Sequence, residues 1–156
     1  MNKLKKILVI NGPNLNLLGE REPKIYGKIS LKDIENNLSK LEKNISYNID
    51  CTQSNHEGEL IEIVQKAHKN YSGIIINAGG YSHTSIALMD ALKFFSKPII
   101  EVHMSNIYER ENFRHSSYIS QVANGSICGF GALGYEMAVN CIIKLIDVYN
   151  NKNQEN

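Results

Sequence analysis

A chain of 156 residues is long enough to bury one hydrophobic core and too short for two domains of ordinary size. Its 17 lysines and arginines nearly balance its 16 acidic residues, which argues against a nucleic-acid or anionic-membrane partner and favours a small molecule. The three cysteines form no C-x-x-C pair, a pattern typical of reduced thiols in the cytosol. We therefore expect one cytoplasmic domain that spans residues 1–156.

The N-terminal segment begins with basic residues, as a signal peptide does. However, the apolar run 7–10 is too short for the hydrophobic region of such a peptide and ends at Asn11-Gly12-Pro13. No later apolar run has the length that a membrane-spanning helix requires. The sequence thus predicts neither a secretion signal nor a membrane anchor.

Strand and helix patterns alternate along the chain. The expected elements are, in order, strand 7–10, helix 34–45, strand 47–52, helix 60–67, strand 73–76, helix 86–92, strand 98–102, strand 125–130 and helix 135–149. We expect the strands to be fully buried and parallel. Ser30 and Asp33 resemble a capping box before the first helix, and the polar tail 150–156 is expected to be disordered. This alternation predicts a flavodoxin-like, doubly wound parallel sheet of five strands in the order 2-1-3-4-5.

In open α/β sheets the ligand lies beyond the carboxyl ends of the strands, so the loops there are the first places to look for a site. The connection 11–27 after the first strand is long and rich in glycine and proline, which is typical of a functional or a disordered loop. Its apolar residues argue against disorder. Its glycines would let a lid carry Arg21 and Tyr26 over a substrate, although an ordinary surface loop with an exposed arginine explains the pattern equally well.

The loop 77–85 after the third strand predicts a carboxylate-binding site. Its two glycines allow close approach of the backbone, and its amide groups lead into the N-terminus of a helix. The alternatives are that Thr84 or Ser85 only caps this helix and that His83 is a structural histidine.

Glu101 and His103 follow the fourth strand and lie two residues apart, so both side chains leave the same face of the strand. A buried carboxylate is costly without a partner, and the imidazole is the obvious one. A histidine oriented in this way is suited to general acid catalysis, whereas a purely structural ion pair is the alternative.

Two further patterns lie downstream. Arg110 and Arg114 would share one face if 107–113 is helical, although exposed arginines are usually just solvated. The glycines of 129–134 match a dinucleotide-binding pattern, but the strand and acidic residue that should follow are absent. These glycines are expected to serve the close packing of the last strand and helix.

Taken in order, N-G-P-N-L-N-L-L-G-x-R-E-P-x-x-Y-G, N-A-G-G-Y-S-H-T-S, E-V-H-M-S-N, R-E-N-F-R-H and G-F-G-A-L-G-Y closely resemble the type II dehydroquinase family over nearly the whole chain. The resemblance implies a cofactor-free lyase that converts 3-dehydroquinate to 3-dehydroshikimate by anti elimination through an enolate. It places the reaction in the shikimate pathway of aromatic amino-acid biosynthesis or in quinate catabolism. It also implies a homo-oligomer, a dodecamer built from trimers.

The resemblance further implies a role for each matching residue. Tyr26 is the base, Arg21 is the lid residue that activates it, and His103 is the proton donor. Asn14 helps to hold the water that stabilises the enolate, and Glu101 orients His103. The residues implied in substrate binding are Asn77, His83, Met104 and Ser105 through their amides, Arg114, and Asp90 near a subunit contact. Position 104 is commonly isoleucine or leucine in this family, and methionine has a similar volume.

The implied reaction needs a base for the α-proton, donors for the enolate oxygen and an acid for the departing hydroxide. A tyrosine at its reference pKa of about 10 is almost fully protonated at pH 7, so one or two nearby arginines are needed to favour ionisation. A phosphate-binding switch domain is disfavoured because Pro13 removes a backbone donor and Asn77 stands where aspartate is wanted. A metal hydrolase that uses Glu101, His103 and His83 would lack the H-E-x-x-H spacing.

Overall fold

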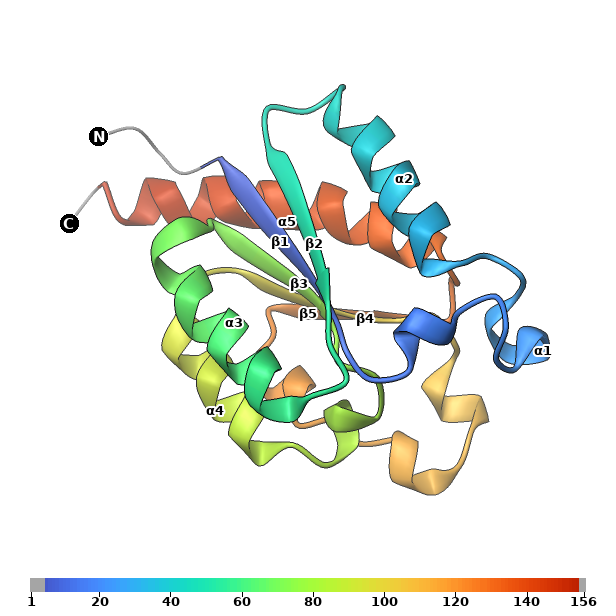
Figure 1. Cartoon of the computed structure of the whole chain (residues 1–156). Helices are drawn as coiled ribbons and strands as arrows, with labels where there is room; N and C mark the ends of the chain where they lie inside the picture. The colour runs from blue at the N-terminus through green and yellow to red at the C-terminus, as the bar shows by residue number, and fades with distance from the viewer. Residues whose placement is uncertain (1–4, 155–156) are drawn as a thin grey trace.

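The computed structural model describes residues 5–154 and is built around a parallel sheet of five strands. The strands are β1 (Lys6–Asn11), β2 (Asn48–Gln53), β3 (Gly73–Asn77), β4 (Ile99–His103) and β5 (Gly125–Cys128). They lie in the order β2-β1-β3-β4-β5 (Figure 1), which confirms the predicted topology. All four pairings are parallel.

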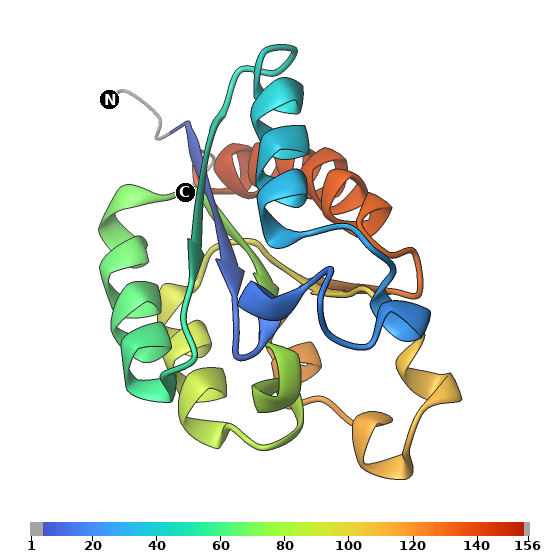
Figure 2. The same cartoon turned by 45° about the vertical axis from the view of Figure 1, so that its right-hand side comes forward.

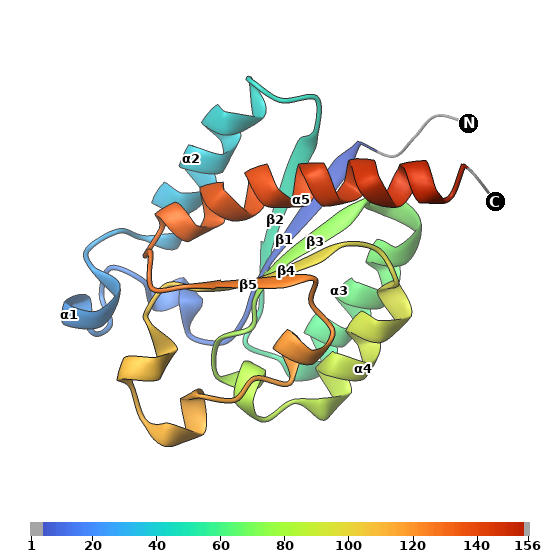
Figure 3. The ribbon, with the colours of Figure 1, turned by 180° about the vertical axis from the view of Figure 1, so that it is seen from behind.

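The helices are α1 (Pro23–Tyr26), α2 (Leu31–Glu42), α3 (Glu57–Asn70), α4 (Ile86–Phe95) and α5 (Leu133–Lys152). Helices α2 and α5 cover one face of the sheet, and α3 and α4 cover the other. Figure 3, which shows the molecule from the back, has α5 lying across the near face of the strands. The capping box is confirmed, because Ser30 Oγ accepts from Asp33 N at 3.1 Å and Asp33 Oδ2 accepts from Ser30 N at 2.9 Å. Every helix within residues 5–154 is too short or too polar to span a lipid bilayer.

The central strands are buried on both faces because each contributes side chains to two hydrophobic cores, one on either side of the sheet. Ile7 and Val9 of β1 pack toward α2 and α5, whereas Leu8 and Ile10 pack toward α3 and α4. The edge strands β2 and β5 are only half-buried, so the expectation of five fully buried strands is wrong for these two. An edge strand has a neighbour on one side only and is less completely covered.

Two sequence expectations about helices need correction. Helix α5 begins at Leu133 and continues to Lys152, so the start of the tail 150–156 is helical; residues 155 and 156 lie outside the described part. Once a helix exists, each added residue gains a backbone hydrogen bond at little cost. The segment 107–113 is not one α-helix but two 3-10 turns, η3 (Ile107–Glu109) and η4 (Asn112–Arg114), because Arg110 between them has an extended backbone.

Candidate active site

A pocket lies at the carboxyl ends of β1, β3 and β4, where the three following loops meet. Figure 2 shows the blue segment with α1 beside the orange turns that follow β4. Nine of the residues singled out from the sequence line this pocket: Asn14, Arg21, Tyr26, Asn77, His83, His103, Met104, Ser105 and Arg114. Arg110, which had no assigned role, lines it as well.

The loops after β1 and β3 are held against each other by their backbones. The amide of Gly12 donates to the carbonyl oxygen of Asn77 at 2.8 Å, and a Cβ at position 12 would lie 2.4 Å from the carbonyl oxygen of Ala78. Only glycine fits there. Asn14 follows in a left-handed conformation (φ 68°), and its amide donates to Asn55 Oδ1 at 2.9 Å. This contact places Asn14 at the pocket wall.

Tyr26 ends the short helix α1, which begins with Pro23 at a position where proline is favoured. Its hydroxyl oxygen lies 2.6 Å from Nη1 of Arg110, whose guanidinium carbon lies 5.5 Å from the ring centroid. The guanidinium of Arg110 therefore donates directly to the phenol oxygen. The predicted activating residue, Arg21, lines the pocket but pairs with Glu22 at 3.4 Å. The arginine at the hydroxyl of Tyr26 is therefore Arg110.

Glu101 and His103 leave the same face of β4, as their spacing predicts. Nε2 of His103 lies 3.0 Å from Oε2 of Glu101, an ion-pair contact that does not have the geometry of a hydrogen bond. Glu101 lies behind His103 and does not line the pocket. Burial alone raises the pKa of Glu101, but the contact with His103 and hydroxyl donors outweigh it and lower that pKa to about 2. The carboxylate is thus ionised beneath the imidazole.

His83 ends η2 (Gly79–His83) and reaches the same pocket as His103. Its Nδ1 lies 2.7 Å from the carbonyl oxygen of Ser116, so Nδ1 carries the proton that it donates and Nε2 is left for a ligand. The two imidazole rings stack at 6.0 Å between centroids. Burial lowers the pKa of His83, and the charges of His103 and Arg114 lower it further. His83 is therefore suited to bind as a neutral imidazole.

Asn77 is held by two residues that the sequence reading did not select. Its Nδ2 donates to Oη of Tyr135 at 3.0 Å, and that hydroxyl donates to Oδ1 of Asn11 at 2.6 Å. Burial raises the pKa of Tyr135, so the phenol stays protonated. Asn77 Oδ1 also accepts from the amide of Gly79 at 3.2 Å. The only available signal was that Tyr135 directly follows the glycine-rich segment 129–134, in the first turn of α5.

Three other residues considered in the sequence analysis lie outside this pocket or have a structural role. Ser85 caps α4 by accepting from the amide of Leu88 at 2.9 Å, as the structural alternative proposed. Asp90 lies on α4 in a separate groove with Gln65 and Phe94, away from this pocket. Gly134 packs against Val102, where a Cβ would lie 3.4 Å from Cγ1. That agrees with a packing role for the glycines of this segment.

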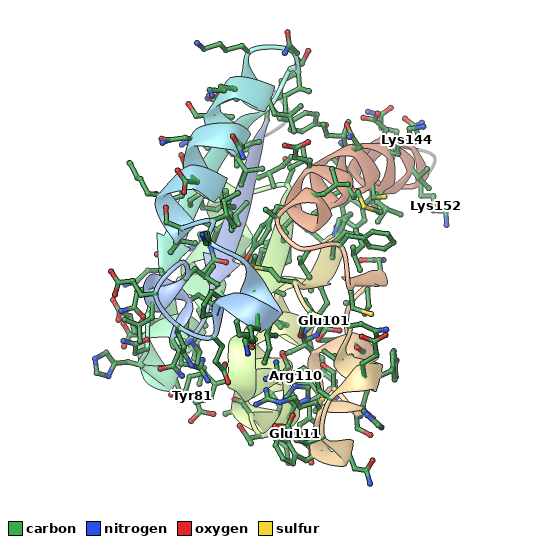
Figure 4. All side chains as sticks on the ribbon, turned by 90° about the vertical axis from the view of Figure 1, so that its right-hand side faces the viewer. Tyr81, Glu101, Arg110, Glu111, Lys144 and Lys152 are labelled. Carbon is green, nitrogen blue, oxygen red and sulfur yellow. The ribbon has the colours of Figure 1, made fainter. Side chains whose placement is uncertain are left out.

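The charged groups of this end of the molecule face one another. Figure 4 shows Glu101, Arg110 and Glu111 on one side at the carboxyl end of the sheet, with Lys144 and Lys152 away from them on α5. Arg114 donates from Nε to Glu111 Oε2 at 2.8 Å. Within residues 5–154, no three His, Cys, Asp or Glu side chains are grouped so that they could hold a metal ion.

A doubly wound parallel sheet that gathers a phenol, two imidazoles and three arginines around one pocket defines an α/β enzyme of acid–base chemistry. The family model for class II dehydroquinases matches residues 5–143. The chain belongs to the class II dehydroquinase family.

Individual relatives agree with this assignment. A 3-dehydroquinate dehydratase of Polynucleobacter asymbioticus is 54% identical over 144 residues, which cover 92% of this chain and 97% of that protein. The 3-dehydroquinate dehydratase 1 of Agrobacterium fabrum is 52% identical over 136 residues, covering 87% and 94%. The crystal structure of the type II dehydroquinase from Butyrivibrio crossotus superposes with a TM-score of 0.86 at 48% identity, covering 88% and 96%.

Proposed function

We propose that this enzyme dehydrates 3-dehydroquinate to 3-dehydroshikimate by anti elimination through an enolate. The observation that carries the proposal is the pairing of Tyr26 with Arg110 and of His103 with Glu101 at one pocket. One pair is built to take a proton and the other to give one. They reach the pocket from different elements, α1 and β4, so a substrate between them can be served by both.

In the proposed reaction, Tyr26 as phenolate removes the α-proton of the ketone, and Arg110 stabilises the phenolate beforehand. Asn14 helps to hold a water molecule that donates to the enolate oxygen. His103 then gives its proton to the departing hydroxyl group, which leaves as water. The proton on Tyr26 returns through solvent to His103, so the enzyme is unchanged after one turnover.

Substrate binding is assigned to the groups that remain around the pocket. Arg114 and the amides of Met104 and Ser105 provide donors for a carboxylate or hydroxyl group. Asn77 and His83 are oriented by Tyr135 and by the carbonyl of Ser116, which fixes the direction of their hydrogen bonds. Arg21 is assigned to the wall of the loaded site, where a closing lid brings its guanidinium to the substrate.

The proposed setting is the shikimate pathway in the cytoplasm, with quinate catabolism as the alternative. The three cysteines are all unpaired thiols, which supports a reducing compartment. We also propose a homo-oligomer, a dodecamer built from four trimers. The groove on α3 and α4 exposes Phe94 beside Asp90 and would supply one contact between chains.

The test is direct: purified protein is mixed with dehydroquinate without any added cofactor, and ultraviolet absorbance of the conjugated enone is followed. We expect a new absorbance, and we expect activity to survive a chelator and borohydride added with substrate. Borohydride inactivation would indicate an imine to a lysine and would remove the enolate mechanism. Absence of product from well-folded protein would remove the proposed substrate.

A further inference from the structure

The carboxylate of Glu101 has more hydrogen-bond donors around it than orientation of one histidine requires. Its side chain is fully buried. Ser117 donates to Oε2, Ser120 donates to Oε1, and Ser126 donates to Oε1 at 2.8 Å. We refer to Ser117, Ser120 and Ser126 as the serine cage. Together with the ion-pair contact from His103 at 3.0 Å, four polar groups surround the carboxylate, which has about four lone-pair sites when ionised.

The fold brings the three serines to Glu101 from two directions. Ser126 on β5 is the Cα partner of Glu101 in the parallel pairing of β4 and β5, so their side chains share a face of the sheet. Ser117 precedes, and Ser120 lies within, the 3-10 helix η5 (Ile119–Gln121). Ile119 is buried in the core beneath α3 and α4, which anchors η5 over the carboxylate. The cage is therefore built from two separate parts of the chain, strand β5 and the segment that leads into η5.

A saturated carboxylate cannot bind substrate, so the effect of the serine cage on the reaction has to pass through His103. A carboxylate in an apolar interior becomes neutral unless donors stabilise its charge. Three hydroxyl groups supply that stabilisation without adding any positive charge that would oppose an imidazolium. The cage thus favours the one charged form of Glu101 that attracts a proton to its neighbour.

The other charges around His103 leave Glu101 as its one acidic partner among the described residues. The titratable and charged groups that share its pocket are His83 from η2, Tyr26 and Arg21 from the first loop, and Arg110 and Arg114 from the turns after β4. The three arginines are paired with other carboxylates, Arg21 with Glu22, and Arg110 and Arg114 with Glu111. Among the described residues, Glu101 is the carboxylate in contact with His103.

We propose that Ser117, Ser120 and Ser126 are positioning residues for the reaction, which hold the carboxylate of Glu101 against His103, the residue that gives a proton to the departing hydroxyl group. The proposal rests on the proposed function, in which His103 is the acid. Loss of hydroxyl groups should let the carboxylate turn away from the imidazole, and an imidazolium that has lost the adjacent negative charge should lose its proton at lower pH. The fall of turnover on the alkaline side should move to lower pH accordingly.

The first experiment compares the double variant Ser117→Ala/Ser120→Ala with the native protein at saturating dehydroquinate. We expect the alkaline fall of turnover to move down by about one pH unit, equivalent to a roughly tenfold weaker hold on the proton. The Michaelis constant should change little, because the cage does not touch substrate. Ser39→Ala, an exposed position on α2, is the matched control and should leave the pH profile unchanged.

The second experiment uses Ser126, which is exposed on the edge strand β5 and whose replacement should leave the fold intact. Ser126→Ala should shift the profile in the same direction, and Ser126→Thr should restore it, because threonine keeps the hydroxyl and suits a strand. A merely structural serine would change the melting temperature of both variants without moving either profile.

The titration of His103 by nuclear magnetic resonance, in protein with isotope-labelled histidine and without substrate, separates the possible failures. A downward shift in Ser126→Ala and in the double variant supports the serine cage. If His103 titrates as in the native protein in both, the proposal is overturned, whatever the stability of the variants. If His103 shifts while the turnover profile does not, the cage acts on His103 but His103 is not the acid, and the proposed function fails instead.

Discussion

At the scale of single residues, the hydroxyl of Tyr26 is the group on which the proposed proton abstraction depends. Tyr26→Phe removes that oxygen and retains the ring that packs at the pocket. We expect turnover to fall by about 10²-fold or more, the lower range for loss of a general base, while substrate binding is largely kept. Turnover from steady-state kinetics and binding by calorimetry check this. Near-native turnover would reassign the base.

The arginines of the pocket carry the same charge, but replacing each of them should change the kinetics differently, because their positions in the pocket differ. Arg110 contacts the hydroxyl of Tyr26, so Arg110→Ala should lower turnover by about 10- to 100-fold, the value of a hydrogen bond to a charged group. Arg114 lines the pocket and is assigned to substrate binding, so Arg114→Ala should chiefly raise the Michaelis constant. Arg21 was the activating residue expected from the sequence, and Arg21→Ala should lower turnover less than Arg110→Ala.

The comparison of these arginines is made at saturating substrate, and Arg110→Lys serves as the control. Lysine keeps a positive charge without the planar fork of arginine. Partial recovery in Arg110→Lys would indicate that charge near Tyr26 is what matters. If Arg21→Ala lowers turnover more than Arg110→Ala does, then Arg21 rather than Arg110 contacts the hydroxyl of Tyr26 once the lid has closed over the substrate.

At the scale of elements, the loops after β1 and β3 are joined at a point where no side chain fits. Gly12→Ala would place a Cβ 2.4 Å from a backbone oxygen, so the two loops would have to separate. We expect a loss of about 1–3 kcal/mol of unfolding free energy, as for other overpacked sites, and lower activity because Asn14 and Asn77 move apart. Urea denaturation and turnover measure the two effects.

The matched control for this change is Gly58→Ala, in the first turn of α3, where an added Cβ meets nothing within 4 Å. Alanine is favoured over glycine in a helix by roughly 1 kcal/mol, so this variant should be slightly more stable and fully active. A Gly12→Ala protein as stable and active as Gly58→Ala would show that the two loops adjust without strain.

At the scale of the whole molecule, the sequence predicted the sheet because buried parallel strands are continuous apolar runs, and the strand order brings the ends of β1, β3 and β4 together. It also predicted the pair Glu101 and His103, because spacing by two fixes a shared face. Contacts between polar side chains on loops far apart in the sequence could not be predicted, because they depend on how the loops are placed in space. Arg110 resembles any solvated arginine until α1 is placed beside it, and loop serines resemble turn or cap residues until η5 is folded over Glu101.

The free energy of unfolding at low pH is also a property of the whole molecule, because Glu101 joins β4, β5 and η5 through its hydrogen bonds. Its pKa in the folded protein is lowered to about 2, whereas an unfolded glutamate has a pKa of about 4.3. Between these values the unfolded chain binds a proton that the folded chain does not, so lower pH favours unfolding. The stabilisation is fully present above about pH 4.3 and is lost as the pH falls toward about 2, by at most about 1.4 kcal/mol per pH unit.

We expect the free energy of unfolding of the native protein to fall more steeply across this window than that of Glu101→Gln, measured by urea denaturation at each pH. Glutamine occupies the same volume and does not titrate there. Asp33, whose pKa is lowered by the amide and hydroxyl of Ser30, contributes in the same direction but is present in both proteins. The difference between the two curves therefore isolates Glu101. Parallel curves would mean that Glu101 is not ionised in the folded protein, and the acid–base pair beneath the pocket would then lack its anion.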